Sequence, residues 1–419
     1  MKDPQRYLLV THIPFARDAA GQPVTDGLWV RDLVGLAESV GSVRVVAPEV
    51  PREALTTWGP TACAFPGHAP VEFRGFPFLR SRRDLWKWPA IRAVLREEVK
   101  AASLVHTSHL FRPWLGLAYA HDLAVKLGKK TIFVVAEDFR DIQTWEWIRC
   151  SKGFERLRRE RTLRAIEKRV TRSASTASLT FLHTPAAVER YRLDAKQAVA
   201  IRQPGHTREE VISSEALRAR VATLSENRPL RLVAACRHVG LKGLDMLVQA
   251  ISLLADRGIP VSATLYGGGP ESESLRSLAS RLGVAQRIKM PGPLPAGAEL
   301  NEALRRADLF LMPHRTTDFG RAFFDAMAAG LPVLAFRTPA SIDTVYEGLD
   351  GFLAPLDDIN GLAERIAGLH RNRHLLAAAS HGARARALEN TRAEWFRLRA
   401  KWTLSLLNEQ ATGELAHAA

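Results

Sequence analysis

The sequence predicts an α/β fold of two Rossmann-like domains in tandem, and three observations lead to this prediction. Strand-like apolar runs alternate with amphipathic helical stretches through the first half of the 419-residue chain, and the alternation begins again after residue 230. Between the two series lies SENRPL (225–230), a polar junction that contains a proline. Strands that alternate with helices form a parallel sheet covered on both faces. This length suits two domains, which we expect to face each other across a ligand-binding cleft.

The first series begins with YLLVTHIPF, which has the pattern of a buried strand. GLWVRDLVGLAESV follows, and its apolar residues recur at helical spacing. The further expected elements are strands at 43–48, 103–110 and 131–138, a Leu/Ala-rich helix at 116–128, a basic segment at 152–172 and a strand at 178–184.

The second series begins with the strand RLVAAC and the amphipathic stretch GLDMLVQAISLLADRG. It continues with strands at 261–266, 288–292, 307–313, 330–336 and 351–355, a helix at 273–283, and a last helix at 391–410. We therefore expect one domain at 1–225, a second at 226–390, and a C-terminal helix within 391–419 that crosses back to the first domain.

Composition excludes several classes of protein. Apolar residues make up 46% of the chain and charged residues 25%, which is typical of a globular protein and not of a disordered chain, collagen or a coiled coil. The three cysteines, Cys63, Cys150 and Cys236, are widely spaced and form no zinc-binding pattern. No apolar run approaches the ~20 residues of a membrane-spanning helix, and the start lacks a signal-peptide pattern. We expect a cytosolic protein.

Positive charge is concentrated in the first half of the chain. Residues 1–225 hold 36 basic against 24 acidic side chains, and residues 226–419 hold 23 against 20, which gives a net charge of +15. Segment 76–100 mixes cations with Phe and Trp, and segment 152–172 carries nine cations against three carboxylates. Such stretches are typical of elements that bind an anionic membrane surface, although a solvated Arg-rich helix has the same composition. Because no nucleic-acid-binding module is evident, we expect no nucleic-acid partner.

Residues suited to binding phosphate gather in the second half, each after a predicted strand. Arg237 and Lys242 lie on one loop, where a guanidinium and an ammonium can both reach a diphosphate. Gly268 lies in the glycine run 267–269, which allows the backbone to approach a ligand closely. Two surface cations and an ordinary tight turn would give the same residues, so each feature is weak alone.

A strand, loop and helix at 307–329 form the third feature. A polar loop that begins at His314 leads to Gly320, and a helix is predicted from about Arg321. The amino end of a helix attracts anions through its N–H groups and its dipole. Asp325, within this helix, can accept hydrogen bonds from a ribose diol; an ordinary surface carboxylate is the alternative.

The second half resembles the retaining, nucleotide-sugar-dependent glycosyltransferases of family 4, which have the GT-B fold. RHVGLKG (237–243) is similar to the family's Arg-x4-Lys diphosphate loop, and YGGGP (266–270) is similar to its Gly-x-Gly-Pro turn. DFGRAFFDAMAAGLPV (318–333) resembles the family segment Glu-Gly-Phe-Gly, four residues, then Glu-Ala-Met-Ala-x-Gly-x-Pro-Val. The similarity covers about residues 229–360. The first half matches only in general layout, as expected of a domain that binds a variable acceptor.

By position, the resemblance implies roles for individual residues. Arg237 and Lys242 are the candidate catalytic pair, which would hold the donor diphosphate. Phe319 and Gly320 would offer backbone N–H groups to the phosphates and the donor sugar. Asp325 takes the place of the family's ribose-binding Glu.

Some positions depart from the family pattern. Thr317 replaces the first Glu of the family pair, which commonly contacts the donor sugar, and His314 replaces a small Ser. Glu137 and Asp138 stand where the family often has a His, so no role for a histidine is transferred. The full set of candidate donor-binding residues is Gly27, Gly268, His314, Thr317, Asp318, Phe319, Gly320 and Asp325.

The resemblance implies an enzyme that moves a sugar, with retained anomeric configuration, from a nucleotide-sugar to a lipid-linked or saccharide acceptor. The products expected are cell-surface polysaccharide, lipopolysaccharide or glycolipid, made at the inner face of the membrane. We expect a UDP-sugar rather than a GDP-sugar as donor, no other cofactor and no metal site. The alternatives are a non-catalytic sugar-nucleotide-binding or scaffold protein on the same fold, an epimerase, and a glycoside phosphorylase.

Overall fold

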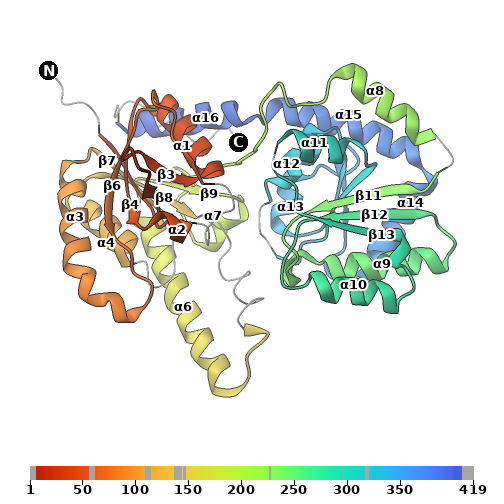
Figure 1. Cartoon of the computed structure of the whole chain (residues 1–419), viewed down its shortest axis with the longest axis horizontal. Helices are drawn as coiled ribbons and strands as arrows, with labels where there is room; N and C mark the ends of the chain where they lie inside the picture. Colours follow the sequence, from red (N-terminus) through yellow and green to blue (C-terminus); the bar gives the residue numbers. More distant parts are fainter. Residues whose placement is uncertain are drawn as a thin grey trace. The chain divides into compact units, whose positions relative to one another are not determined.

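The computed structural model describes residues 6–55, 62–108, 115–135, 144, 148–225, 228–295, 297–316 and 320–407. The chain forms two compact units. Unit 1 comprises Met1–Ala136, Leu157–Ile201 and Phe396–Ala419, and unit 2 comprises Glu137–Arg156 and Arg202–Trp395. Each unit contains one large parallel sheet with helices against it (Figure 1). The prediction of two Rossmann-like domains is therefore confirmed.

The sheet of unit 1 has seven parallel strands in the order β10-β9-β8-β7-β1-β4-β6. Runs such as YLLV and LTFL are buried along their whole length, because the sheet is covered on both faces. The strands are β1 (Tyr7–Val10), β4 (Val43–Glu49), β6 (Val71–Pro77), β7 (Leu104–Ser108), β8 (Lys130–Val135), β9 (Leu179–Leu182) and β10 (Ala198–Ala200).

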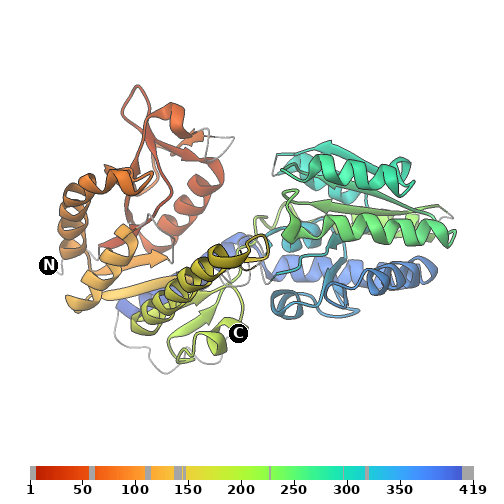
Figure 2. The ribbon, with the colours of Figure 1, turned by 90° about the horizontal axis from the view of Figure 1, so that it is seen from below.

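Helices and a small second sheet complete unit 1. The helices are α1 (Gly27–Val40), α2 (Arg52–Leu55), η1 (Arg82–Lys87), α3 (Trp88–Ala101), α4 (Leu115–Lys126), α6 (Gly153–Thr176) and α7 (Ala186–Arg190). Helix α6, yellow in Figures 1 and 2, is a single continuous helix whose first turns lie beyond the sheet. An antiparallel sheet of β2 (Ala16–Arg17), β3 (Pro23–Asp26) and β5 (Ala62–Ala64) was not predicted from the sequence.

The last helix, α16 (Arg392–Leu407), returns to unit 1, as predicted. The ring of Phe396 packs against α1 so closely that a Cβ added at Gly35 would lie 2.8 Å from it. Further along, the ring of Trp402 lies 6.2 Å from that of Phe181 in β9, and the guanidinium of Arg399 lies over the same phenyl ring. Aromatic packing and cation–π contacts therefore hold α16 on unit 1.

The sheet of unit 2 has six parallel strands in the order β13-β12-β11-β14-β15-β16. Numbered along the chain this order is 3-2-1-4-5-6, the doubly wound arrangement in which strand order reverses between the first and fourth strands. The strands are β11 (Leu230–Ala235), β12 (Val261–Tyr266), β13 (Ile288–Gly292), β14 (Leu309–Met312), β15 (Val333–Phe336) and β16 (Gly351–Ala354).

Two apolar clusters separate the helices of unit 2 into layers. Helices α9 (Leu244–Asp256), α10 (Ser272–Arg281) and α14 (Ile359–Arg371) bury their apolar faces on one side of the sheet. On the other side lie α11 (Ala298–Arg305) and α12 (Ala322–Ala328) (Figure 1), and α15 (Arg373–Glu389) contributes buried residues to both clusters. The remaining elements are α8 (Ser214–Ala222), η3 (Thr223–Ser225), η4 (Gly240–Lys242), η5 (Ala285–Arg287) and α13 (Pro339–Thr344).

Candidate functional site

Three loops of unit 2 leave the carboxyl ends of neighbouring strands. The loop 236–243 follows β11, the glycine turn 267–270 follows β12, and the segment from residue 313 follows β14. Strand β11 lies between the other two, and the strand order reverses between β11 and β14. Ligands of open parallel sheets bind at such a reversal, outside the carboxyl ends of the strands. The fold therefore brings the predicted phosphate-binding loops to the place where a ligand is expected.

The loop after β11 is bonded to the glycine turn through the backbone. The His238 N–H donates to the Gly268 carbonyl at 2.9 Å, and the Glu271 N–H donates to the His238 carbonyl at 3.1 Å. Gly267 has a φ of 121°, and a Cβ there would lie 1.9 Å from the Cys236 carbonyl oxygen. Only glycine allows the two backbones to approach this closely.

The same loop also packs against the segment after β14. Gly243 adopts a left-handed conformation, with a φ of 65°, and a Cβ there would lie 2.0 Å from the Pro313 carbonyl oxygen. The Arg315 N–H donates to the Leu241 carbonyl at 3.0 Å. Glycine at 243 and at 267 thus allows the backbones of three loops to pack against one another.

The Arg315 side chain ties these loops together. Its guanidinium donates to both carboxylate oxygens of Asp245 in α9, at 2.9 and 2.7 Å, and to the Gly240 carbonyl at 2.8 Å. It also donates to Asp357, beyond β16, at 3.1 Å. A forked pairing of this kind fixes geometry as well as adding energy. Arg315 is therefore a positioning residue for the loop that carries Arg237 and Lys242.

The two predicted cations differ in burial. Arg237 is exposed, whereas Lys242, at the end of η4, is 8% exposed. Between them, His238 hydrogen-bonds through Nδ1 to the Ser272 hydroxyl at 2.9 Å. Burial lowers the pKa of His238, with a smaller opposing effect from a hydrogen bond to the Tyr266 backbone. The ring is therefore neutral near pH 7, and the positive charge of this loop comes from Arg237 and Lys242.

The segment after β14 holds most of the other predicted residues. His314 is buried, and a Cβ added at Gly320 would lie 2.2 Å from Met312 Cε and 3.8 Å from His314 Cε1. Asp325, half-buried, lies in the first turn of α12, whose described N–H groups at 323 and 324 already donate to carbonyls of residues 320 and 321. These two N–H groups therefore already have acceptors within the backbone.

The structure describes some of the remaining predicted residues and not others. Thr317, Asp318 and Phe319 lie outside the described residues, as do Glu137 and Asp138. Gly268 belongs to the glycine turn, and a Cβ there would meet nothing within 4 Å, so its outer side is open. Gly27 begins helix α1 in unit 1, after β3 and not directly after the first strand.

Sequence reasoning missed Arg315 and its partners. Asp245 and Asp357 lie 70 and 42 residues away along the chain, so no local spacing connects them with Arg315. The one sequence signal for Arg315 was its place in the polar loop that begins at His314, which was already a candidate part of the site. Among the described residues, no group of three or more His, Cys, Asp or Glu side chains could hold a metal ion.

Comparison with known proteins identifies unit 2. Residues 229–372 match the family described as Glycosyl transferases group 1. The matched part of unit 2, residues 229–372, is a group 1 glycosyltransferase domain. Its motifs are the basic loop, the glycine turn and the strand–loop–helix segment described above.

Curated relatives that are named as sugar transferases match part of this chain. One is the GDP-mannose-dependent alpha-(1-6)-phosphatidylinositol monomannoside mannosyltransferase of Mycolicibacterium smegmatis, 33% identical over 171 residues. Another is the amylovoran biosynthesis glycosyltransferase AmsK of Erwinia amylovora, 29% identical over 143 residues. The alignments cover 39% and 33% of this chain, and they span 44% and 35% of those relatives. The chain thus matches less than half the length of either relative.

Solved structures match this chain over nearly its whole length. Anabaena Alr3699/HepE in complex with UDP has a TM-score of 0.66 at 17% identity, with 96% of this chain and 99% of that chain covered. WaaG, a glycosyltransferase involved in lipopolysaccharide biosynthesis, has a TM-score of 0.62 at 18% identity, with 94% and 99% covered. At such identities the likeness establishes the fold, which is GT-B, as predicted.

Proposed function

We propose that the protein is a retaining glycosyltransferase that moves a sugar from a nucleotide-sugar to an acceptor in the synthesis of cell-surface polysaccharide, lipopolysaccharide or glycolipid. The observation that carries this proposal is the meeting of three motif loops at the strand reversal of unit 2, with Arg237 and Lys242 on the central loop. Two cations on one rigid loop suit a diphosphate, which carries charge on both phosphates.

The chemistry needed from the protein is chiefly electrostatic. When the bond between the donor sugar and the diphosphate breaks, negative charge grows on the departing phosphate oxygen. Arg237 and Lys242 would stabilise that charge, and backbone N–H groups at Phe319 and Gly320 would add to it. The acceptor hydroxyl would attack from the face that the diphosphate leaves and would give its proton to the departing phosphate oxygen, so the anomeric configuration is retained. Asp325 would accept hydrogen bonds from the ribose, and Thr317 would lie near the donor sugar.

Donor binding and acceptor binding would then belong to different units. Unit 2 would bind the donor, and unit 1, which lies outside the family match at residues 229–372, would bind the acceptor. The named relatives and structures include both a GDP-mannose-dependent enzyme and a complex with UDP. We retain UDP-sugar as the favoured donor, to be decided by assay.

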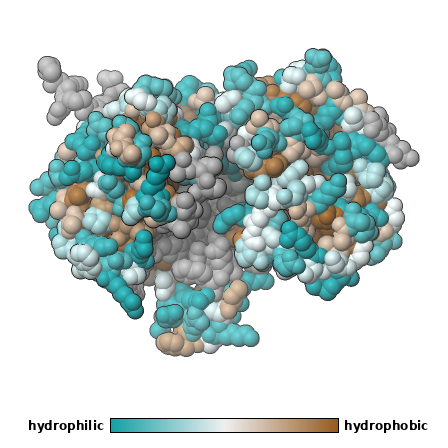
Figure 3. Space-filling view, viewed as in Figure 1, coloured by the Kyte–Doolittle hydropathy of each residue, from teal (hydrophilic) through white to brown (hydrophobic). Residues whose placement is uncertain are grey.

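Unit 1 offers two elements suited to an anionic membrane surface. Trp86, in η1, is 75% exposed and lies beside exposed arginines of segment 76–100. Phe154, at the start of α6, is 79% exposed and is followed one turn later by the exposed Leu157. The tip of α6 in Figure 3 mixes hydrophilic and apolar side chains in this way. From these exposed aromatic and basic side chains we propose peripheral binding at the inner face of the membrane. None of the described helices is long and apolar enough to cross a membrane.

The test of activity uses UDP-, GDP- and ADP-sugars with a crude lipid extract as acceptor. We expect transfer from one donor, and sharply reduced turnover in Arg237→Ala and Lys242→Ala. The matched controls are Arg281→Ala and Arg371→Ala, two exposed arginines at the ends of α10 and α14. Turnover near the wild-type rate in both site variants would contradict the proposal.

The same assay separates the alternatives. An epimerase would convert the free sugar nucleotide without an acceptor, and a glycoside phosphorylase would require inorganic phosphate. A scaffold protein would bind a sugar nucleotide without any turnover. Each of these outcomes would contradict the transferase proposal and favour one named alternative.

The test of membrane binding is sedimentation with anionic vesicles at low and high salt. We expect binding at low salt that Trp86→Asp and Phe154→Asp each weaken. Leu375→Asp, at an exposed apolar position on α15, should leave it unchanged. If the wild-type protein stays in the supernatant at low salt, the membrane proposal is wrong.

A further inference from the structure

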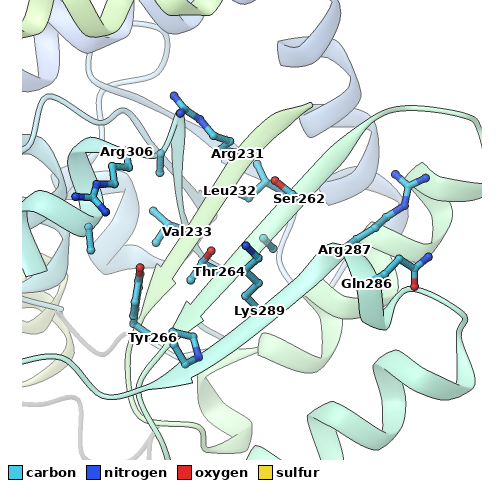
Figure 4. Close-up of a pocket in the computed structure, with 14 residues that line it drawn as sticks. Arg231, Leu232, Val233, Ser262, Thr264, Tyr266, Gln286, Arg287, Lys289 and Arg306 are labelled. Carbon is cyan, nitrogen blue, oxygen red and sulfur yellow. The ribbon is translucent and has the colours of Figure 1, made fainter. Parts of the chain in front are cut away.

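One half of the unit 2 sheet has a face that no helix covers fully. On the side of α11 and α12, the strands β11, β12 and β13 border an open cavity of about 410 Å³ (Figure 4). Parallel strands are usually covered on both faces, and a small-molecule pocket typically occupies about 300–1,000 Å³. We call this space the sheet-face cavity.

The floor of the sheet-face cavity is polar, unlike an ordinary sheet interior. The residues of β12 alternate, so that Ser262, Thr264 and Tyr266 are half-buried while the residues between them are fully buried. Thr264 is in register with Val233 of β11 and with Lys289 of β13. Neighbouring strands lie about 4.8 Å apart, so a hydroxyl and an ammonium stand side by side on this face. Figure 4 shows the two side chains next to each other.

Four cations line the sheet-face cavity, and no carboxylate is among its lining residues. Two of them have acidic partners: Arg231 is bonded to the buried Asp308, and Arg306, on the side of α11, pairs with Glu302. Arg287 donates to a backbone carbonyl at 3.2 Å, and Lys289 is exposed and makes no ion pair with any described residue. The cavity thus keeps positive charge that nothing in its own wall neutralises.

The sheet-face cavity is separate from the proposed donor site. Its lining contains none of the predicted donor-binding residues, and it extends over the sheet face towards the amino ends of the strands, at Arg231 and Arg306. Tyr266 alone connects the two places, because it lines the cavity and directly precedes the glycine turn.

We propose that the sheet-face cavity binds a small, multiply charged phosphate anion, with Lys289 and Arg306 as its charged partners and Thr264 as a hydroxyl partner. Ammonium, guanidinium and hydroxyl groups together satisfy phosphate oxygens, which accept several hydrogen bonds each. The proposal goes beyond the transferase reaction, and it holds whether or not the donor site binds a sugar nucleotide.

Inorganic pyrophosphate is the probe, and its binding is measured by calorimetry. The double variant Arg237→Ala/Lys242→Ala serves as the starting protein, because it removes the proposed donor site and leaves the sheet-face cavity intact. We expect this protein to bind one pyrophosphate. Adding Lys289→Ala and Arg306→Ala should weaken that binding by at least about tenfold, whereas adding Arg281→Ala and Arg371→Ala should not.

A third variant separates a built site from general attraction of anions. Thr264→Val keeps the shape and the charge of the cavity and removes only a hydroxyl, so we expect it to weaken pyrophosphate binding several-fold. Absence of binding to the starting protein would overturn the proposal, and so would binding that the Lys289/Arg306 changes leave intact. In the reverse test, Lys289→Ala/Arg306→Ala is made in the protein with intact Arg237 and Lys242. Pyrophosphate binding that remains there reports on the donor site, so the two proposals fail independently.

Discussion

Replacing Arg315 by Ala should both destabilise unit 2 and weaken donor binding. The substitution removes the guanidinium that joins the loop after β11 to the segment after β14. Without it, the loop that carries Arg237 and Lys242 loses its connection to Asp245 and Asp357, and the two cations lose their fixed positions. The change touches no predicted donor-binding residue.

The size of the effect follows from four hydrogen bonds. Three go to carboxylates, and the Asp245 and Asp357 side chains are 32% and 47% exposed, so solvent screening reduces each to about 0.5–1 kcal/mol. The fourth, to the Gly240 carbonyl, contributes about 1 kcal/mol. The free energy of unfolding should therefore fall by about 3 kcal/mol, which corresponds to a Tm lowered by about 6–12 °C for a unit of this size.

Thermal unfolding and donor titration together test this prediction. Arg315→Lys keeps the charge but not the fork, so it should lie between wild type and Arg315→Ala in both assays. Asp245→Asn combined with Arg315→Ala should cost clearly less than the sum of the single changes, because the two residues share one interaction. A Tm within about 1 °C of wild type for Arg315→Ala, with unchanged donor affinity, would refute the positioning role.

Three further predictions concern single residues. Gly243→Ala should destabilise the protein more than Gly283→Ala does. Both positions have positive φ, which costs about 1–2 kcal/mol for alanine, but of these two only residue 243 has a backbone carbonyl where the added Cβ would lie. Urea unfolding of the two variants measures the difference. Burial raises the pKa of Asp308, but hydrogen bonds from two arginines outweigh burial and hold that pKa below its ordinary value. The Asp308 carboxylate therefore stabilises the fold above about pH 4, and this stabilisation is lost as the pH falls. The loss of stability caused by Asp308→Asn should accordingly become smaller as the pH falls through that range. Gly35→Val should push the Phe396 ring away from α1, and overpacking of this kind destabilises a protein by about 1–3 kcal/mol. We expect faster hydrogen exchange in α16 and unchanged exchange in β11.

Apolar periodicity predicted the elements that bury most of their surface. The helix expected at 27–40 has the same bounds in the structure, and strands such as β11 and β16 agree within one or two residues. These segments are regular because a parallel sheet covered on both faces demands continuous apolar strands and amphipathic helices. The small antiparallel sheet was missed because its strands, such as Ala16–Arg17, are too short for any period to show.

The sequence predicted some residues of the candidate site and not others, for a similar reason. Residues presented directly by the loops after strands, such as Arg237 and Gly268, could be chosen from sequence because the carboxyl ends of parallel strands gather in one place. The Arg315 network could not, because its partners come from other loops at long separations. The alternation in β12 that forms the floor of the sheet-face cavity is visible in VSATLY, but its meaning depends on which helix covers that face.

The proposed diphosphate site is tested most simply by comparing the binding of UDP with that of uridine, and the binding of GDP with that of guanosine, in titrations of the protein. If Arg237 and Lys242 hold the diphosphate, the wild-type protein should bind one nucleoside diphosphate far more tightly than its nucleoside. Either alanine substitution should reduce that preference by about 10- to 150-fold, the effect of losing one charge-assisted hydrogen bond, and should leave nucleoside binding unchanged. If both variants keep the wild-type preference for the diphosphate, the central claim is wrong.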